Sequence, residues 1–363
     1  MSEILQEKID LLKKSKQNIL DKNFKILFFM TDSEIASAAV YELYNQVKIL
    51  REIGYDAKIL TDKNDFQVPE FLDQDLKALP HISAEGQTFS ISTEDFIIIP
   101  ELFVNIMEQV KNLPCEKILL LQNFENAVRG LLPGASWSDY NIRNIITTNS
   151  KLAELATTYF GKYDTQVYTI GIPDYFKTLS KPKTPVITFY SRNSQELEKV
   201  IKLFYLKYPH YRFISFEDLR GTSREEYAKK LADSIACIWL DRISSFGTTP
   251  IEAMKVGTVP IGIVPDIIPE YLEDQTKDTG FWVNDLLTIP DCIHEVVKHW
   301  MQNGIPQKLY DDMLETSSKY NIVDSKQTII NTYTYFIDKR INELQYFIDD
   351  NSTRLIVVPE TTI

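Results

Sequence analysis

One stretch of the sequence combines a glycine turn, two threonines and a glutamate in an order that suits anion binding. Residues 238–262 read IWLDRISSFGTTPIEAMKVGTVPIG, which predicts a strand, a loop, a short helix and a second strand. Thr249 suits the N-cap of that helix, Pro250 its first turn and Gly257 its end. A loop that leads into a helix N-terminus presents unpaired N–H groups and the positive end of the helix dipole, which together form an anion site.

Glu252 in this helix has two interpretations. The spacing Thr249-x-x-Glu252 is that of a capping box, in which two side chains satisfy free backbone N–H groups at the helix start. The alternative is a carboxylate that binds a ligand beside the loop. The Phe246-Gly247 step before the helix and the GTVP sequence after it favour ligand binding.

These segments carry a resemblance to a known family. The sequences FG at 246–247, TPIEAM at 249–254 and GTVPI at 257–261 resemble the donor-site signature of GT-B glycosyltransferases, especially glycosyltransferase family 4. The likeness spans most of residues 25–335 in the order of its elements and is specific between about 235 and 263. It implies an α/β fold of two Rossmann-like doubly wound domains that face each other across a cleft, with a nucleotide diphosphate sugar as donor.

The resemblance also implies roles for individual residues. Arg192, in the sequence YSR at 190–192, and Lys199 correspond to the cations that hold the donor diphosphate, and Glu252 to the carboxylate that binds the ribose. The catalytic residues implied are Arg192, Lys199 and Glu252, and the donor-binding residues are Asp241, Ser244, Phe246, Gly247, Thr248, Thr249 and Glu252.

Two positions depart from the family pattern. The family carries a second glutamate eight residues before the ribose glutamate, where this chain has Ser244, and Asp241 is the nearest carboxylate. The spacing from Arg192 to Lys199 is also longer than usual. The first departure removes the basis for naming the donor sugar or the stereochemical outcome.

The acceptor is expected on the first domain. Ligands of open α/β sheets bind at the carboxyl ends of the strands. Four polar residues follow predicted strands there and form the acceptor-side set: Asp32, Ser33, Glu101 and Asn123.

Two successive series of strands and helices predict two domains. Apolar runs predict strands near 25–30, 57–60, 96–100, 117–122, 144–148 and 166–170, then near 186–190, 211–216, 235–240 and 259–263. We assign residues 1–175 to an acceptor-side domain and 176–335 to a donor domain. Residues 336–363 are assigned to a C-terminal helix and tail that could cross back to the first domain. The helix itself is expected at about 326–348. An amphipathic helix at 1–22 is interpreted as packed on its own domain, with a membrane-surface anchor as the alternative.

Several classes of protein are disfavoured. The turns after both first strands lack the glycines of a dinucleotide site, and no Gly-Lys-Ser/Thr loop is present, so dehydrogenase and P-loop chemistry are not expected. No histidine or cysteine cluster has metal-ligand spacing, so neither a metal nor another cofactor is expected. A net charge of -12 disfavours nucleic acid as a partner and bulk binding to anionic membranes.

The sequence therefore predicts a metal-independent glycosyltransferase that moves a hexosyl or deoxyhexosyl unit to a glycan or glycolipid acceptor, in surface polysaccharide synthesis. We expect a cytoplasmic protein, because residues 1–7 carry no leader pattern and no apolar run reaches membrane-spanning length. Membrane association would be at most peripheral. The alternatives are a nucleotide-sugar epimerase of the same architecture and a non-catalytic sugar-nucleotide binding module, the latter suggested by Ser244.

Overall fold

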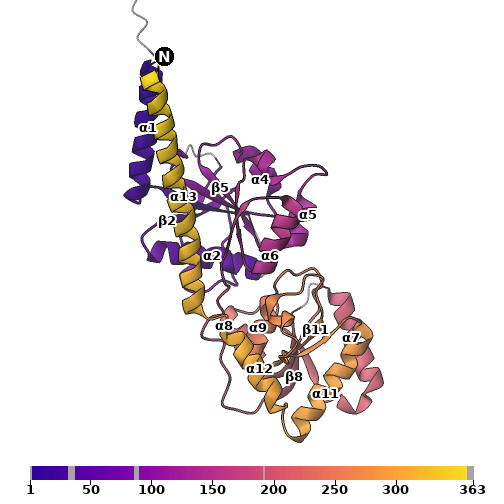
Figure 1. Ribbon diagram of the computed structural model, residues 1–363. Helices are drawn as coiled ribbons and strands as arrows, with labels where there is room; N and C mark the ends of the chain where they lie inside the picture. Colours follow the sequence, from indigo (N-terminus) through magenta and orange to yellow (C-terminus); the bar gives the residue numbers. More distant parts are fainter. Residues whose placement is uncertain (1, 32–36, 86–89, 191–192, 358–363) are drawn as a thin grey trace, which may run out of the picture.

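A computed structural model describes residues 2–31, 37–85, 90–190 and 193–357 and contains two separate parallel sheets (Figure 1). The first sheet has the strand order β3-β2-β1-β4-β5-β6-β7. Its strands are β1 (Lys25–Met30), β2 (Asp56–Thr61), β3 (His81–Ser83), β4 (Phe96–Pro100), β5 (Glu116–Leu121), β6 (Asn144–Thr147) and β7 (Asp164–Val167).

The second sheet has the order β12-β11-β10-β8-β9. Its strands are β8 (Thr184–Phe189), β9 (Ser215–Asp218), β10 (Ser234–Trp239), β11 (Val259–Ile263) and β12 (Phe281–Val283). In chain order this is 2-1-3-4-5, a doubly wound arrangement whose direction of winding changes between β8 and β10. The first sheet changes direction between β1 and β4. The expected pair of Rossmann-like α/β domains is confirmed.

Helices cover both sheets. They are α1 (Ser2–Leu20), α2 (Ala38–Glu52), α3 (Gln74–Lys77), α4 (Val104–Val110), α5 (Phe124–Gly130), α6 (Ser150–Leu155), α7 (Ser194–Lys207), α8 (Arg224–Asp233), α9 (Thr248–Lys255), α10 (Glu270–Glu273), α11 (Ile289–Gln302), α12 (Gln307–Ser318) and α13 (Ile322–Val357). No helix in the described part of the chain is long and apolar enough to cross a membrane.

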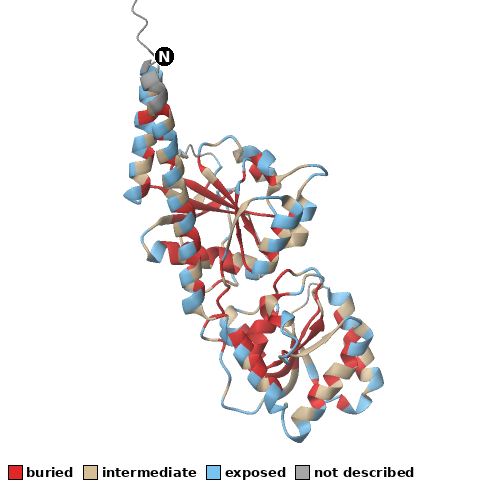
Figure 2. Ribbon diagram, in the orientation of Figure 1, coloured by how far each residue is buried: buried red, intermediate tan, exposed pale blue. Residues whose placement is uncertain are grey.

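The central strands are buried on both faces, which explains why they read as continuous apolar runs (Figure 2). Every residue of β4, β10 and β11 is buried. Of the four edge strands, β3 and β12 have three residues each and are mostly half-buried. The buried strands therefore fix the position of the loops at their carboxyl ends.

Helix α13 follows the second domain in the chain but packs on the first. It lies along α1 and also contacts α2, and the paired helices extend beyond the first sheet (Figure 1). Tyr333 of α13 donates a 2.6 Å hydrogen bond to Gln46 of α2. Inside the pair Ile9 and Ile19 of α1 are buried, as expected for a helix packed on its own domain. The boundary predicted at residue 336 falls inside α13, which starts at Ile322.

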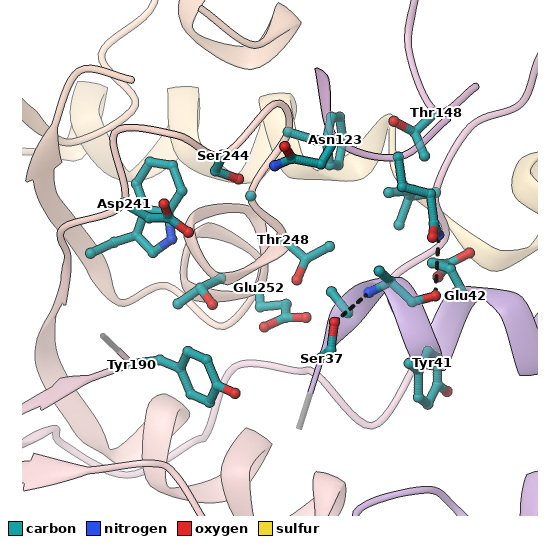
Figure 3. Close-up of a pocket in the computed structure, with 18 of the residues that line it drawn as sticks. Ser37, Tyr41, Glu42, Asn123, Thr148, Tyr190, Asp241, Ser244, Thr248 and Glu252 are labelled. Carbon is teal, nitrogen blue, oxygen red and sulfur yellow. Dashed lines mark hydrogen bonds between the residues drawn. The ribbon is translucent and has the colours of Figure 1, made fainter. Parts of the chain in front are cut away.

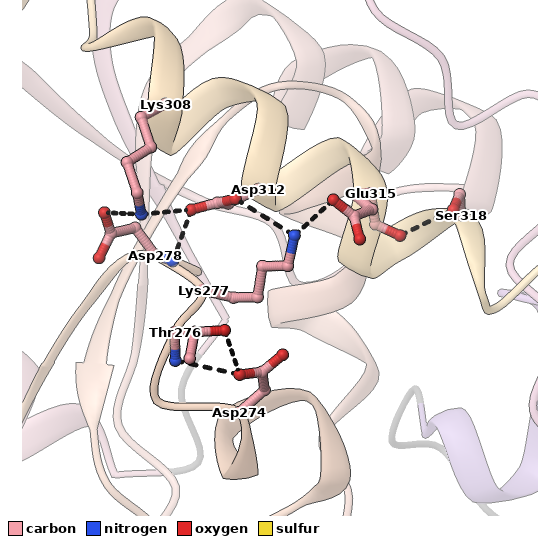
Figure 4. Close-up of polar contacts among 8 residues, drawn as sticks. All are labelled: Asp274, Thr276, Lys277, Asp278, Lys308, Asp312, Glu315 and Ser318. Atoms are coloured by element: carbon pink, nitrogen blue, oxygen red, sulfur yellow. Dashed lines mark hydrogen bonds and ion pairs between the residues drawn. The ribbon is translucent and has the colours of Figure 1, made fainter.

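A polar cluster joins α12 to the segment before β12 (Figure 4). Asp312 of α12 accepts hydrogen bonds from the Asp278 N–H group at 3.0 Å and from Lys308 at 2.7 Å. Lys277 reaches the same helix through Glu315. These contacts lie on the exposed side of the second domain, and we assign them to anchoring the segment.

Candidate active site

A cleft of about 390 Å³ lies between the two domains and is lined by residues of both (Figure 3). The first domain contributes the start of α2 and the residues that follow β4, β5 and β6. The second contributes Tyr190 after β8, the segment after β9, and the loop between β10 and α9. The cleft therefore lies at the carboxyl ends of both sheets, where open α/β sheets bind ligands.

Most of the residues predicted for the site line this cleft. From the donor set these are Asp241, Ser244, Phe246, Gly247, Thr248, Thr249 and Glu252, and from the acceptor set Glu101 and Asn123. Arg192, Asp32 and Ser33 lie outside the described residues. The structure shows which of the described side chains line the cleft, and the individual role of each stays a prediction.

Lys199 is not brought to the site. It lies exposed on α7, whose inner face is formed by Leu197, Val200 and Phe204, and it is not among the described residues that line the cleft. Lys199 lies on the solvent side of the helix, away from the face that these three apolar residues form. The described structure does not place Lys199 in the cleft, and its role toward the donor diphosphate stays a prediction.

The loop before α9 is held in one shape by a glycine. Gly247 is the N-cap of α9, with φ of 71°, and a Cβ atom there would lie 2.4 Å from the Trp239 ring. Tyr271 donates a 2.7 Å hydrogen bond to the Phe246 carbonyl from the outer side of the loop. Gly247, Thr248 and Thr249 at the start of α9 line the cleft, and a helix start without a side-chain cap suits a phosphate group.

The predicted cap of this helix is wrong in detail. The helix starts at Thr248 rather than Pro250, and no side chain caps it. The Thr249 hydroxyl instead accepts a hydrogen bond from Tyr227 at 3.2 Å, and Glu252 is bound elsewhere. The cause is the positive φ of Gly247, which turns the chain into the helix one residue before the expected cap. The capping-box interpretation of Glu252 is therefore excluded.

We expect Gly247→Ala to lower the free energy of unfolding by about 2 kcal/mol, because a methyl group would meet the Trp239 ring and the residue would be strained at positive φ. Urea unfolding measures the change. Gly221→Ala is the matched control, since Gly221 has φ of 76° but nothing within 4 Å of the position that its new methyl group would take. Equal losses in the two variants would show that Trp239 is not the cause.

Glu252 is fully buried at the floor of the cleft. Its Oε1 accepts a hydrogen bond from Arg224, the first residue of α8, and its Oε2 has no hydrogen-bond partner. Burial alone would lower the pKa of Arg224, but the adjacent Glu252 carboxylate raises it above its usual range. The second oxygen of Glu252 is thus left for a ligand.

Two further carboxyl groups line the cleft from the first domain. Burial raises the pKa of Glu42 to about 8 and that of Glu101 to about 7. The Oε2 of Glu101 accepts from the Gln122 N–H group at 3.1 Å, whereas the Oε2 of Glu42 has no hydrogen-bond partner. Perturbed carboxyl groups in a cleft are typical of functional sites.

Glu42 predicts a pH dependence of stability. Its carboxyl group stays protonated in the folded protein up to about pH 8 but ionises near 4.5 in the unfolded chain, so unfolding releases a proton between these values. The free energy of unfolding should therefore fall as the pH rises from 5 to 8. We expect Glu42→Gln to raise the free energy of unfolding by about 1–3 kcal/mol at pH 8 and to leave it nearly unchanged at pH 5.

The control for that prediction is Glu52→Gln on the same helix. The Glu52 carboxylate is exposed and pairs with Lys326 at 2.6 Å, so its removal should not alter the pH profile in this direction. An unchanged pH profile in Glu42→Gln would contradict the assignment.

Direct bonds close the cleft on one side. Asn123 donates a 3.0 Å hydrogen bond from Nδ2 to the Ile243 carbonyl, and the Phe124 N–H group donates to the Ser245 hydroxyl at 2.9 Å. Both join the loop after β5 to the loop before α9. Asn123 therefore joins the two walls of the cleft, in addition to the acceptor contact predicted for it.

Within the described ranges, no group of three or more His, Cys, Asp and Glu side chains is arranged to hold a metal ion. The metal independence expected from the sequence stays a prediction.

Comparison with known proteins found a relative in sequence and several solved structures of similar fold. The chain is 24% identical over 251 residues to an alpha-1,6-glucosyltransferase of Actinobacillus pleuropneumoniae serotype 7 (strain AP76), a match that covers 66% of this chain and 73% of the relative. No protein-family model matches.

Solved structures match over nearly their whole length. Sucrose-phosphate synthase from Thermosynechococcus elongatus has a TM-score of 0.61 at 11% identity, covering 87% of this chain and 99% of that one. Anabaena HepE in complex with UDP-glucose has a TM-score of 0.59 at 14% identity, covering 86% and 99%. The chain has the GT-B fold. Membership of glycosyltransferase family 4 stays a prediction.

Two residues of this GT-B cleft were missed by the sequence reasoning, Arg224 and Glu42. Arg224 starts a polar helix and looks there like an ordinary surface cation. Glu42 had a usable signal, because it is a charged residue inside the apolar stretch AAVYELY, on the face of a helix that must be buried. Three-dimensional packing was needed to place both beside Glu252.

Proposed function

We propose that this protein transfers a hexosyl or deoxyhexosyl unit from a nucleotide diphosphate sugar to a glycan or glycolipid acceptor. One observation carries the proposal. Glu252 is fully buried, is charge-paired through one oxygen and leaves the other without a partner in a cleft between two doubly wound domains. A ribose with two adjacent hydroxyl groups fits such an acceptor atom.

The loop before α9 supplies the second half of the donor site. Its N–H groups and the helix dipole suit the diphosphate, whose negative charge grows as the sugar leaves. Arg192 is assigned to the same charge by the resemblance. Ser244 and Asp241 line the cleft nearby and are assigned to the sugar.

The named relatives suggest which donor to test first. One relative is named as a glucosyltransferase, and one structural neighbour was solved with UDP-glucose. We therefore propose UDP-glucose as the first candidate donor. We also propose that the protein is cytoplasmic and has a role in surface polysaccharide synthesis. Closure of the domains over the donor would exclude water and limit hydrolysis.

A thermal-shift screen with UDP, GDP, dTDP and UDP-glucose tests the proposal. A ligand at 100 times its dissociation constant stabilises the folded state by about 2.7 kcal/mol, which such a screen detects. Stabilisation by none of the four would contradict the proposal. The same screen and a transfer assay should be unchanged by EDTA, and activity that EDTA abolishes and Mn²⁺ restores would refute metal independence.

Product analysis separates transfer from its rivals. An epimerase would convert the nucleotide sugar without an acceptor, and a binding module would bind it without turnover. Incubation of UDP-glucose with and without a mixed glycan pool, followed by chromatography of sugars and nucleotides, should show acceptor-dependent release of UDP. Acceptor-independent formation of a new nucleotide sugar would favour the epimerase.

A further inference from the structure

Arg224 differs in its charge from the other described residues that line the cleft. It carries the one positively charged side chain among the described residues that line the cleft. Its guanidinium donates to Glu252 Oε1, and the two side chains are 16% and 0% exposed. A guanidinium and a carboxylate at this depth depend on each other, because both are largely removed from water.

Aromatic rings fix the guanidinium in place. Its Cζ lies 5.2 Å from the centroid of Tyr41, 4.8 Å from that of Phe176 and 5.2 Å from that of Tyr227. Tyr41 belongs to α2 of the first domain, and the other two rings belong to the second. Such contacts attract a cation and exclude water from around it. Arg224 is thus held in one orientation by both domains.

Among the described residues, Arg224 is the one cation bonded to Glu252. The titratable groups that face it in the described structure are Arg224 and Tyr227 from α8, Cys237 from β10 and Glu42 from α2. Three of these are neutral or acidic. In this described surrounding, the orientation of the Glu252 carboxylate therefore depends on its bond to Arg224.

We infer that Arg224 is a positioning residue for nucleotide binding: it holds Oε1 of Glu252, so that Oε2 accepts hydrogen bonds from the ribose hydroxyls. The inference rests on the proposed function. It differs from a direct role of Arg224 on the donor diphosphate, which would make Arg224 act independently of Glu252.

A double-mutant cycle with UDP-glucose as the probe separates these roles. Calorimetric dissociation constants are measured between pH 6 and 8 for the parent, Arg224→Met, Arg224→Lys, Glu252→Gln and the Arg224→Met/Glu252→Gln double variant. UDP-glucose is suitable because its diphosphate is esterified at both ends and keeps its charge over this range.

A positioning role predicts a distinct pattern. Arg224→Met should bind about tenfold more weakly than the parent at pH 6, and the deficit should shrink towards pH 8, because an unpaired buried carboxyl group takes up a proton as the pH falls. Arg224→Lys retains the charge and should restore the pH profile of the parent. In the Glu252→Gln background, Arg224→Met should change the affinity less than about threefold.

Three results would overturn the inference. The first is a deficit in Arg224→Met that does not vary with pH. The second is a further loss of about tenfold or more in the Glu252→Gln background, which would indicate direct contact with the donor. The third is an Arg224→Lys profile that matches Arg224→Met.

Folding is checked for each variant by circular dichroism. If Arg224→Met does not fold, the double variant and Arg224→Lys keep the test valid. The double variant lacks both buried charges of the pair, and Arg224→Lys retains both. A parent protein that binds none of UDP, GDP, dTDP and UDP-glucose overturns the proposed function and this inference with it. If the parent binds UDP-glucose and the variants give any one of the three results above, the inference alone is overturned.

Discussion

Replacing Glu252 by glutamine is expected to lower the free energy of unfolding of the second domain by about 3 kcal/mol, because the buried Arg224 guanidinium loses its counter-charge. Removal of one partner of a buried ion pair costs about 3–5 kcal/mol, and the glutamine oxygen, which still accepts a hydrogen bond, favours the lower end. Urea unfolding followed by tryptophan fluorescence measures the loss, since Trp239, Trp282 and Trp300 all lie in this domain.

Glu226→Gln is the matched control, because it makes the same change on α8. The Glu226 side chain is 52% exposed and pairs with Lys230 at 3.3 Å, so its loss should be below about 0.5 kcal/mol. Adding Arg224→Met to Glu252→Gln should recover part of the stability by removing the unpaired charge. Equal losses at positions 226 and 252 would show that the buried pair does not stabilise the fold.

Phe336→Ala should be at least as damaging, with a loss of about 3–5 kcal/mol from the first domain. Phe336 lies on α13, is 1% exposed and belongs to the apolar core. Its truncation would therefore leave a cavity under α13, the helix that follows the second domain in the chain and packs on the first. Thermal or urea unfolding followed at Trp137, the tryptophan of the first domain, measures the effect.

The same helix provides a control for this change. Phe347 is 43% exposed, so Phe347→Ala should alter the free energy of unfolding by less than about 0.5 kcal/mol. A small loss in Phe336→Ala would mean that α13 does not contribute to the core of the first domain, which would contradict the packing described above.

The sequence predicted the buried framework well because burial on both faces of a strand leaves a simple pattern. The runs at β1, β4 and β11 were located to the residue. The edge strands β3 and β12 were missed, because a segment of three residues is too short for its pattern to indicate a strand. Strand β9 was expected at 211–216 but begins at Ser215, since the apolar residues before it form a short turn that packs on the sheet.

The site was predictable where one loop carries it and not where two domains build it. The loop before α9 and Glu252 are contiguous in sequence, so local spacing was informative. The contact of Glu252 with Arg224 joins residues 28 positions apart, and Tyr41 comes from another domain, so no local pattern records either. The capping box was a reasonable local interpretation that failed because a buried cation binds Glu252 more strongly than a backbone N–H group would.

The return of α13 to the first domain means that the polypeptide passes between the domains twice. The outgoing and returning passages are joined, since the Ile172 N–H group donates a 2.9 Å hydrogen bond to the Tyr320 carbonyl and the Thr169 N–H group donates to the Thr328 hydroxyl at 3.0 Å. Two crossings side by side resist twisting and sliding more than a single tether does. We expect a rotation about the line of the two crossings to be the motion that opens and shuts the cleft, because it would keep the two walls in register.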